Sequence, residues 1–511
     1  MLDTQPQKFN KFQEYIFPIY KHELKKFVPM SFLMFCILFV YALANGLKDI
    51  FILYNTNLWV GARPEETTSL ISAIKLWYVL PSAVVAVIVF TALLNKFGPD
   101  KTFNITVVGF IIFYALYGFV LYPNSDSLIL SEEKITEMVQ GVPIFFRTFI
   151  TCFANWPFVA FYVISELWGS IMISSLFWQF ANRVTLKHEV TRFFGLFSLV
   201  SSVGTVIAGS TIMNYALNLD VHRVKVLMAG ILITSTIILI IYAYINKLVA
   251  KDVRIYQAEH SPRGSSNKKK VSALEGIKIL FKNPYLMLVS VLILSYGIAI
   301  NFSEILMKAG MKEAFDKSQY AKMQGMLSVF TGIFASVVVL ISANILRKFS
   351  WKVSALVTPL TFLIVGGIFL SLVLYKQFVS ATLFGMSTVT LSAWVGIIHD
   401  ALVRSVKYSL FDTTKSMAYI PLDEDTKTKG QAAVEMIGGR AGKAGSSAVQ
   451  QIMISFPRTL VTTTGTVGGV LAYSPVIIAV FFATVITWTF AVLRLNVRYE
   501  EKIKQLSCEA A

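Results

Sequence analysis

Long apolar segments recur along the whole chain, and they constrain its fold more than any other feature. The chain has 511 residues, of which 55% are hydrophobic and only 15% are charged. A helix needs about 20 apolar residues to cross the hydrocarbon core of a membrane. We read about twelve such segments, at 27–47, 71–94, 103–121, 156–180, 194–215, 226–248, 285–307, 326–346, 354–374, 384–403, 432–454 and 474–493. The sequence therefore predicts an all-α integral membrane protein.

A polar and basic linker lies between the sixth and seventh segments, at about 250–272, and it reads SPRGSSNKKK over 261–270. A plain surface loop is the alternative interpretation. Its central position favours a division into two six-helix halves, 27–249 and 273–495, with tails at 1–26 and 496–511. The halves share short matches. Tyr41 precedes Asp49 by the same interval as Tyr296 precedes Glu304. Two repeats around one cavity are typical of the major facilitator architecture.

Basic residues gather in the N-terminal tail and in every second loop between the predicted spans. By the positive-inside rule, both termini are expected in the cytoplasm. This distribution also accounts for the net charge of +17, so we expect no nucleic-acid partner. The loop cations are Lys96, Lys101, Arg183, Lys187, Arg192, Arg347, Lys348, Lys352, Arg404 and Lys407. The three cysteines are far apart, and no metal or cofactor motif is visible. We therefore expect neither a metal nor a cofactor, and no enzymatic activity.

Four ionisable side chains lie inside the predicted spans: Lys75, Glu166, Glu304 and Lys443. Each would cost about 2.5–3.5 kcal/mol at a helix centre, or on the order of 10 kcal/mol together if none were paired. Any one of them could be a structural ion pair that fixes helix register. Together, and with Arg440 near Lys443, they predict a carrier for a charged solute. Its acids and bases would pair when it is empty and exchange partners when an anion enters.

Four glycines surround Lys443, at Gly438, Gly439, Gly442 and Gly445. Small residues commonly serve close helix packing, but beside two cations they also favour an approaching phosphate. The segment is not a P-loop, because Ala444 follows the lysine and no strand precedes it. A second polar segment, 407–427, follows the tenth span. It is predicted to be either an amphipathic surface segment or a gate that uses Asp423, Glu424 and Asp425.

Several longer motifs resemble the nucleotide transporter family of obligate intracellular bacteria and plant plastids. They are SELWGS (165–170), SLFWQFAN (175–182), VKYSLFD (406–412), MAYIPLDEDTK (417–427) and, as in rickettsial members, EMIGGRAGK (435–443). The likeness runs from about residue 21 to 495. It implies a nucleotide antiporter of a bacterial inner membrane that imports host ATP in exchange for ADP. The expected partners are nucleotides and the lipid bilayer, and we expect a monomer.

The resemblance also implies roles for particular residues. The two lysines and two glutamates that the family requires for transport match Lys75, Glu166, Glu304 and Lys443. We expect Lys75, Lys443 and Arg440 to contact phosphates, and Trp77 or Trp168 to stack on the base. Lys48 and Asp49 match the end of the family's Arg-x-x-Lys-Asp motif. The chain departs from the family pattern at Asn45 (usually Arg), at His399 and Asp400 (usually Gln-Asn) and at Ala444 (usually Ser).

These departures make Asn45, His399 and Asp400 our candidates for substrate specificity. They also leave two alternatives open. One is a family carrier of GTP, CTP, UTP or NAD, with proton coupling as a possible mode. The other is a membrane scaffold or receptor that transports nothing.

Overall fold

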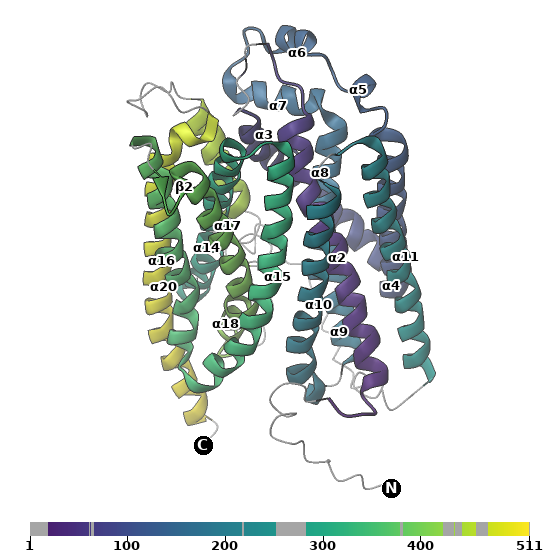
Figure 1. The fold of residues 1–511 in the computed structure, drawn as a ribbon. Helices are drawn as coiled ribbons and strands as arrows, with labels where there is room; N and C mark the ends of the chain where they lie inside the picture. Colours follow the sequence, from purple (N-terminus) through teal and green to yellow (C-terminus); the bar gives the residue numbers. More distant parts are fainter. Residues whose placement is uncertain are drawn as a thin grey trace.

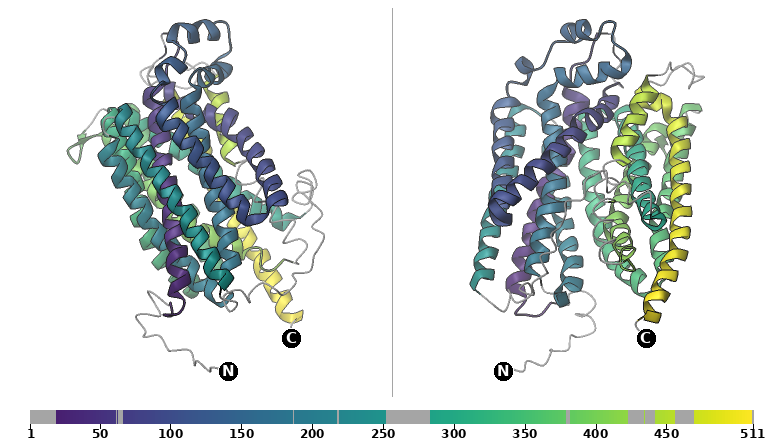
Figure 2. Two further views of the ribbon diagram at one scale, coloured as in Figure 1. Left: turned by 90° about the vertical axis from the view of Figure 1, so that its right-hand side faces the viewer. Right: turned by 180° about the vertical axis from the view of Figure 1, so that it is seen from behind.

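The computed structural model describes residues 19–60, 62, 66–185, 187–216, 219–251, 283–378, 382–422, 434, 442–455 and 469–509. Within these residues the regular structure is helical, apart from a hairpin of two short strands, β1 (Thr382–Leu383) and β2 (Met386–Ser387). The helices stand in two bundles, which Figures 1 and 2 show from three sides. The predicted all-α membrane fold is therefore confirmed.

The first bundle contains the helices of the N-terminal half. Three π-helical segments, η2 (Lys75–Val79), η3 (Tyr117–Leu121) and η4 (Gly169–Phe177), continue helices of this bundle. The α-helices are α2 (Leu24–Asn55), α3 (Thr67–Ile74), α4 (Leu80–Leu116), α8 (Trp156–Trp168), α9 (Trp178–Val184), α10 (Lys187–Tyr215) and α11 (Val221–Lys251). Three shorter helices, α5 (Ser125–Leu128), α6 (Glu132–Val139) and α7 (Ile144–Ala154), cap one end of the molecule, at the top of Figure 1.

The second bundle contains the helices of the C-terminal half. They are α14 (Pro284–Ala314), α15 (Lys317–Lys348), α16 (Trp351–Phe378), α17 (Thr388–Val406), the π-helical η5 (Lys407–Phe411), α18 (Asp412–Met417), a helix over 442–454, the 3₁₀ turn η7 (Gly469–Tyr473) and α20 (Ser474–Glu509). Local sequence explains where several of them begin. The Asn283 side chain accepts a hydrogen bond from the Tyr285 amide at 3.0 Å, and Pro284 occupies the first helical position. Asp316 caps α15 in the same way, through the Gln319 amide at 2.7 Å.

Ten helical stretches among the described residues are long and apolar enough to cross a membrane. One of them, 67–121, contains both the second and the third predicted span. The two meet at Gly98, whose positive φ of 74° breaks the helix without leaving a loop between them. The eleventh predicted span is described only at residue 434 and over 442–454.

The tenth predicted span is longer than the sequence indicated. We expected it to end near residue 403 and placed Arg404 and Lys407 in a loop. That placement is wrong, because the helix continues through η5 and α18 to Met417. Both cations are held inside the molecule by carboxylates on the same helix, as described below. The proposed gate residues Asp423, Glu424 and Asp425 lie outside the described residues, as does nearly all of the predicted linker.

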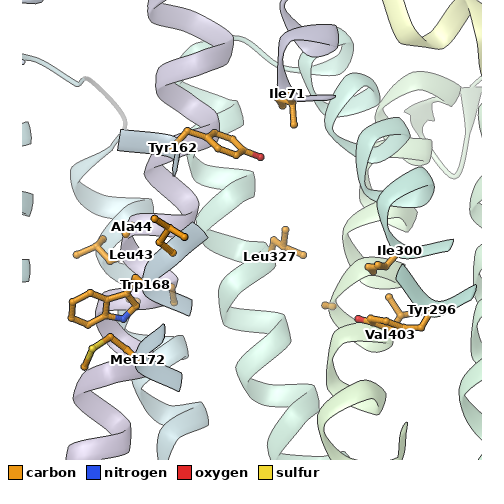
Figure 3. Packing of buried hydrophobic residues seen from close by; sticks show 14 of the residues in the cluster. Leu43, Ala44, Ile71, Tyr162, Trp168, Met172, Tyr296, Ile300, Leu327 and Val403 are labelled. Atoms are coloured by element: carbon orange, nitrogen blue, oxygen red, sulfur yellow. The ribbon is translucent and has the colours of Figure 1, made fainter. Parts of the chain in front are cut away.

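The two bundles meet where α15 packs against α10 and α2. Glycines allow the α10–α15 contact to be very close. A Cβ atom at Gly209 would lie 2.5 Å from the Gly325 carbonyl oxygen, and one at Gly332 would lie 2.7 Å from the Ser202 carbonyl oxygen. Each bundle also has apolar packing of its own, with Trp168 and Met172 in the first and Ile300 and Val403 in the second (Figure 3).

Candidate functional site

A cavity of about 640 Å³ lies between the two bundles. On one side it is lined by α2, η2, α4, α8, η4, α9 and α10, and on the other by α14, α15, α17, η5, α18 and the helix over 442–454. Seven charged side chains face it: the cations Lys75, Arg404, Lys407, Lys415 and Lys443, and the acids Glu166 and Asp412. The described lining therefore carries a clear excess of positive charge, at a depth where an isolated ion is costly.

Lys75 reaches from the first bundle to the second. It begins the π-helical turn η2, where the widened backbone changes the direction of the side chains. Its Nζ donates to the Glu304 carboxylate at 3.1 Å and to the Asn301 side-chain oxygen at 2.7 Å. The amide nitrogen of Asn301 in turn donates to Ser446 Oγ at 2.7 Å and Ser447 Oγ at 3.0 Å. Lys75 is thus linked, through Asn301, to the helix that carries Lys443.

Glu304 receives three cations. Besides Lys75, its carboxylate lies 2.7 Å from Lys308 Nζ and 3.3 Å from Arg404 Nη2. Lys308 is fully buried, and its Nζ also lies 2.8 Å from the Asp49 carboxylate of α2, so it forms a second bridge between the bundles. A buried charge is tolerated only when partners replace the lost water, and here the charges form a continuous network.

The sequence match between the halves has a structural counterpart here. Tyr41 and Tyr296 both line the cavity, and the acids that follow them, Asp49 and Glu304, share Lys308. The corresponding acids of the two halves therefore meet at one cation.

Glu166 pairs with Lys48, within the first bundle. The ammonium of Lys48 also lies 4.6 Å from the centroid of the Tyr162 ring, a cation–π contact. Glu166 precedes the long π-helical segment η4, and its side chain is 24% exposed toward the cavity, whereas Lys48 is 2% exposed. Lys48 therefore holds Glu166 from behind the cavity wall.

Lys443 projects into the cavity from the helix over 442–454 and is exposed there. Among the described residues, no carboxylate lies within salt-bridge distance of its ammonium. Its neighbour Gly442 faces the other way, because a Cβ atom there would lie 2.9 Å from the Leu294 carbonyl oxygen of α14. Gly442 thus serves helix packing, whereas a Cβ at Gly445 would meet nothing within 4 Å. Arg440, Gly438 and Gly439 lie outside the described residues.

The structure brings most of the predicted site residues together. Lys75, Glu166, Lys443 and Asn45 line the cavity. Lys48, Asp49 and Glu304 stand behind its wall and hold charged neighbours in place.

The two predicted stacking residues do not face the cavity. Trp168 is fully buried in the first bundle beside Met172 (Figure 3), and its indole donates to the Ile37 carbonyl at 3.1 Å. Trp77 packs on three phenylalanines of α7 and lies outside the cavity lining. Of the described aromatic side chains, those that line the cavity are Tyr41, Trp178, Tyr296, Tyr408 and Phe411.

Two of the specificity candidates also lie away from the cavity. His399 is buried inside the second bundle, with its ring 5.7 Å from the rings of both Phe362 and Phe369. Asp400 is buried as well, and its carboxylate accepts from Arg404 Nε at 2.6 Å. Asp400 can therefore influence a substrate only through Arg404, and His399 only through packing.

Sequence reasoning did not assign four cations to the site. They are Lys308, Arg404, Lys407 and Lys415. A signal for two of them was available in the helical spacing. Lys308 follows Glu304 by four residues, and Arg404 follows Asp400 by four, so each pair shares a helix face. The charges near the end of span ten were assigned to a loop because the apolar pattern fades there.

Two helical bundles around a central charged cavity form a fold of the major facilitator type. Solved structures support this fold. The D-xylose–proton symporter superimposes with a TM-score of 0.53 at 10% sequence identity, covering 92% of this chain and 97% of that one. A partially occluded, inward-open structure of the xylose transporter XylE from E. coli gives a TM-score of 0.54 at 11% identity, covering 92% and 97%.

The family is given by sequence. The family model described as TLC ATP/ADP transporter matches residues 2–499. ADP,ATP carrier protein 1 of Rickettsia prowazekii is 36% identical over 502 residues, 96% of each chain. Carrier protein 1 of Chlamydia muridarum is 34% identical, covering 97% of this chain and 92% of that protein, and ADP,ATP carrier protein 3 of Rickettsia felis is 31% identical, covering 97% and 99%. The chain belongs to the TLC ATP/ADP transporter family. It is a multi-pass membrane transporter and not an enzyme.

Proposed function

We propose that this protein exchanges nucleotides across a membrane, with ATP entering in exchange for ADP, through alternating access of the cavity between its halves. The observation that carries the proposal is the cavity itself, whose described lining has five cations against two acids, together with five aromatic rings. Its volume of about 640 Å³ lies within the range of small-molecule sites. A nucleotide joins a flat base to a strongly anionic phosphate chain, and this lining offers partners for both.

The charged network gives a physical reason for exchange. Lys75 and Lys308 both bridge the bundles through carboxylates of the partner half. Two other hydrogen bonds between the bundles lie toward the end of the molecule where α2 ends and α3 begins. Lys312 Nζ donates to the Leu53 carbonyl at 2.7 Å, and Gln451 donates to the Ser69 carbonyl at 2.9 Å. An empty carrier that is held by such internal ion pairs changes conformation slowly. A bound phosphate chain replaces some of the partners and lowers the free-energy cost of the conformational change.

The orientation proposed with this function follows the basic loops. Both termini lie in the cytoplasm, and the membrane is a bacterial inner membrane. The first helix α2 begins, and the last helix α20 ends, at the same end of the molecule (Figure 1). The polar contacts between the bundles that were named above then lie toward the outer side of the membrane. We propose that each six-helix half moves as a unit and that one chain contains the complete pathway.

A second candidate is a carrier of another nucleotide, such as GTP, CTP, UTP or NAD. Asn45 favours this alternative, because it lines the cavity where family members usually have arginine. Replacing a cation with a neutral amide weakens the attraction for phosphate and offers a donor and an acceptor to a base.

Uptake into cells that express the chain tests these proposals. Labelled ATP, GTP, CTP and UTP are supplied separately, with and without ADP inside the cells. We expect uptake of ATP that rises with internal ADP and disappears in a Lys443→Ala variant that still inserts into the membrane. A Lys96→Ala variant, which removes an exposed cation outside the cavity lining, is the matched control and keeps uptake. Preference for another base would support the second candidate, and uptake of none of the four would refute nucleotide transport.

A further inference from the structure

The two walls of the cavity differ in charge. The wall from the N-terminal half carries one cation, Lys75, and one acid, Glu166, which cancel. The wall from the C-terminal half carries one acid and four cations, namely Asp412, Arg404, Lys407, Lys415 and Lys443. The positive excess among the described lining residues therefore lies on the C-terminal wall.

Asp412 lies between two of these cations. Its carboxylate is 3.0 Å from Lys407 Nζ and 3.5 Å from Lys415 Nζ, and all three side chains face the cavity. The side chains are 26% exposed for Lys407, 13% for Lys415 and 35% for Asp412. One carboxylate thus holds two ammonium groups in place, in the position that a phosphate would take.

Arg404 and Lys443 extend this positive surface. The Arg404 guanidinium is fixed by two carboxylates, through Nε to Asp400 at 2.6 Å and through Nη2 to Glu304 at 3.3 Å. It is held rigidly while it still lines the cavity, which suits recognition of a planar or tetrahedral anion. Lys443 adds an ammonium that has no described carboxylate within salt-bridge distance.

The N-terminal wall offers neutral polar groups without a net charge, whereas the C-terminal wall combines its cations with neutral groups such as Tyr296, Gln324 and Tyr408. The neutral polar side chains of the N-terminal wall are Tyr41, Asn45, Ser170, Ser174, Ser198, Ser201, Ser202 and Thr205, and Trp178 adds an indole. Hydroxyl and amide groups donate and accept hydrogen bonds without charge, as recognition of a ribose and a base requires. An indole face favours stacking on a flat ring.

From this asymmetry we infer that a nucleotide lies across the cavity with a fixed polarity. Its phosphate chain binds Lys407, Lys415, Arg404 and Lys443 on the C-terminal wall, and its nucleoside faces Asn45 and Trp178 on the N-terminal wall. This inference rests on the proposed function, and it assigns the two ends of the substrate to the two halves. Asp412 is the internal anion that the terminal phosphates displace.

Equilibrium binding to the purified full-length protein in detergent tests the inference. The probes are ATP, ADP and AMP, which share one nucleoside and differ only in phosphate number. We expect Lys407→Gln and Lys415→Gln each to weaken ATP binding about ten-fold to a hundred-fold, because each removes a charge-assisted contact. AMP binding should fall far less, so the ratio of ATP to AMP affinity collapses. Asp412→Asn should instead strengthen ATP binding, because it removes the competing carboxylate.

Controls separate a lost contact from a damaged protein. Lys407→Arg and Lys415→Arg keep the charge and should retain most of the preference for ATP, and Lys96→Gln should change nothing. An equal loss of ATP and AMP binding in both lysine variants, or weaker ATP binding in Asp412→Asn, would overturn the assigned polarity while leaving nucleotide transport intact. A wild-type protein that binds none of the three probes would refute the proposed function and this inference with it.

Discussion

Substitutions in the charged cluster around Glu304 should lower the stability of the protein by different amounts. Replacing Lys75 with glutamine removes one of three cations from Glu304, which keeps Lys308 at 2.7 Å and Arg404 at 3.3 Å. We expect a loss of about 1.5–3 kcal/mol in stability, the value of one charge-assisted hydrogen bond. Replacing Glu304 with glutamine leaves three cations without their shared acid, and we expect a larger loss.

The structure indicates which of the three cations loses the most electrostatic stabilisation when Glu304 is replaced. Lys308 keeps the Asp49 carboxylate at 2.8 Å, and Arg404 keeps the Asp400 carboxylate at 2.6 Å. Among the described residues, the one close polar contact that Lys75 keeps is the neutral Asn301 oxygen. Stranding one buried charge costs about 3–5 kcal/mol. Removing Lys75 as well takes the stranded charge away, so the double variant should be more stable than Glu304→Gln alone.

Thermal unfolding of the purified protein in detergent measures this order. We expect the midpoint to fall from wild type to Lys75→Gln, then to the double variant, and to be lowest for Glu304→Gln. Lys96→Gln, at an exposed position, is the control and should unfold at the wild-type temperature. A double variant that is as unstable as Glu304→Gln, or less stable, would refute the assignment of Lys75 as the stranded charge.

Two further predictions concern helix packing and specificity. Gly209→Ala should lower stability by about 1–3 kcal/mol, because its new Cβ would lie 2.5 Å from a backbone oxygen of α15. Gly195→Ala on the same helix is the control, because its new Cβ would meet nothing within 4 Å. Equal unfolding midpoints for the two variants would contradict the close crossing of α10 and α15. Asn45→Arg should change the order in which nucleotides compete for uptake, because Asn45 lines the cavity. His399→Gln should leave that order unchanged, because His399 is buried inside the second bundle. The opposite result would place selectivity in the second bundle.

Much of the fold and part of the site could be predicted from sequence. The spans follow from apolar length, and Lys75, Glu166 and Glu304 stand out because each is a lone charge within an apolar segment. Their partners are less visible. Glu166 pairs with Lys48, which comes 118 residues earlier in the chain, and no local pattern indicates that pairing.

The errors have two physical causes. Arg404 and Lys407 lie where the apolar pattern fades, and a cation at the end of a span is ordinarily a loop residue. The fold shows that the helix continues and that Asp400 and Asp412 hold these cations inside the protein. The second cause applies to Trp168, which was expected to face the cavity. An aromatic residue near a functional acid can face the core as easily as the cavity, and one residue along a helix changes the direction by about 100°.

Efflux from proteoliposomes tests the central claim, obligatory exchange of nucleotides through the charged cavity, most directly. Vesicles that contain the purified protein are loaded with labelled ADP and diluted into buffer with or without external ATP. The paired charges predict that label leaves rapidly only when external nucleotide is present, and that Lys443→Ala vesicles release little under either condition. Rapid release into nucleotide-free buffer would contradict the account, because the empty carrier would then return without a substrate to replace its internal ion pairs.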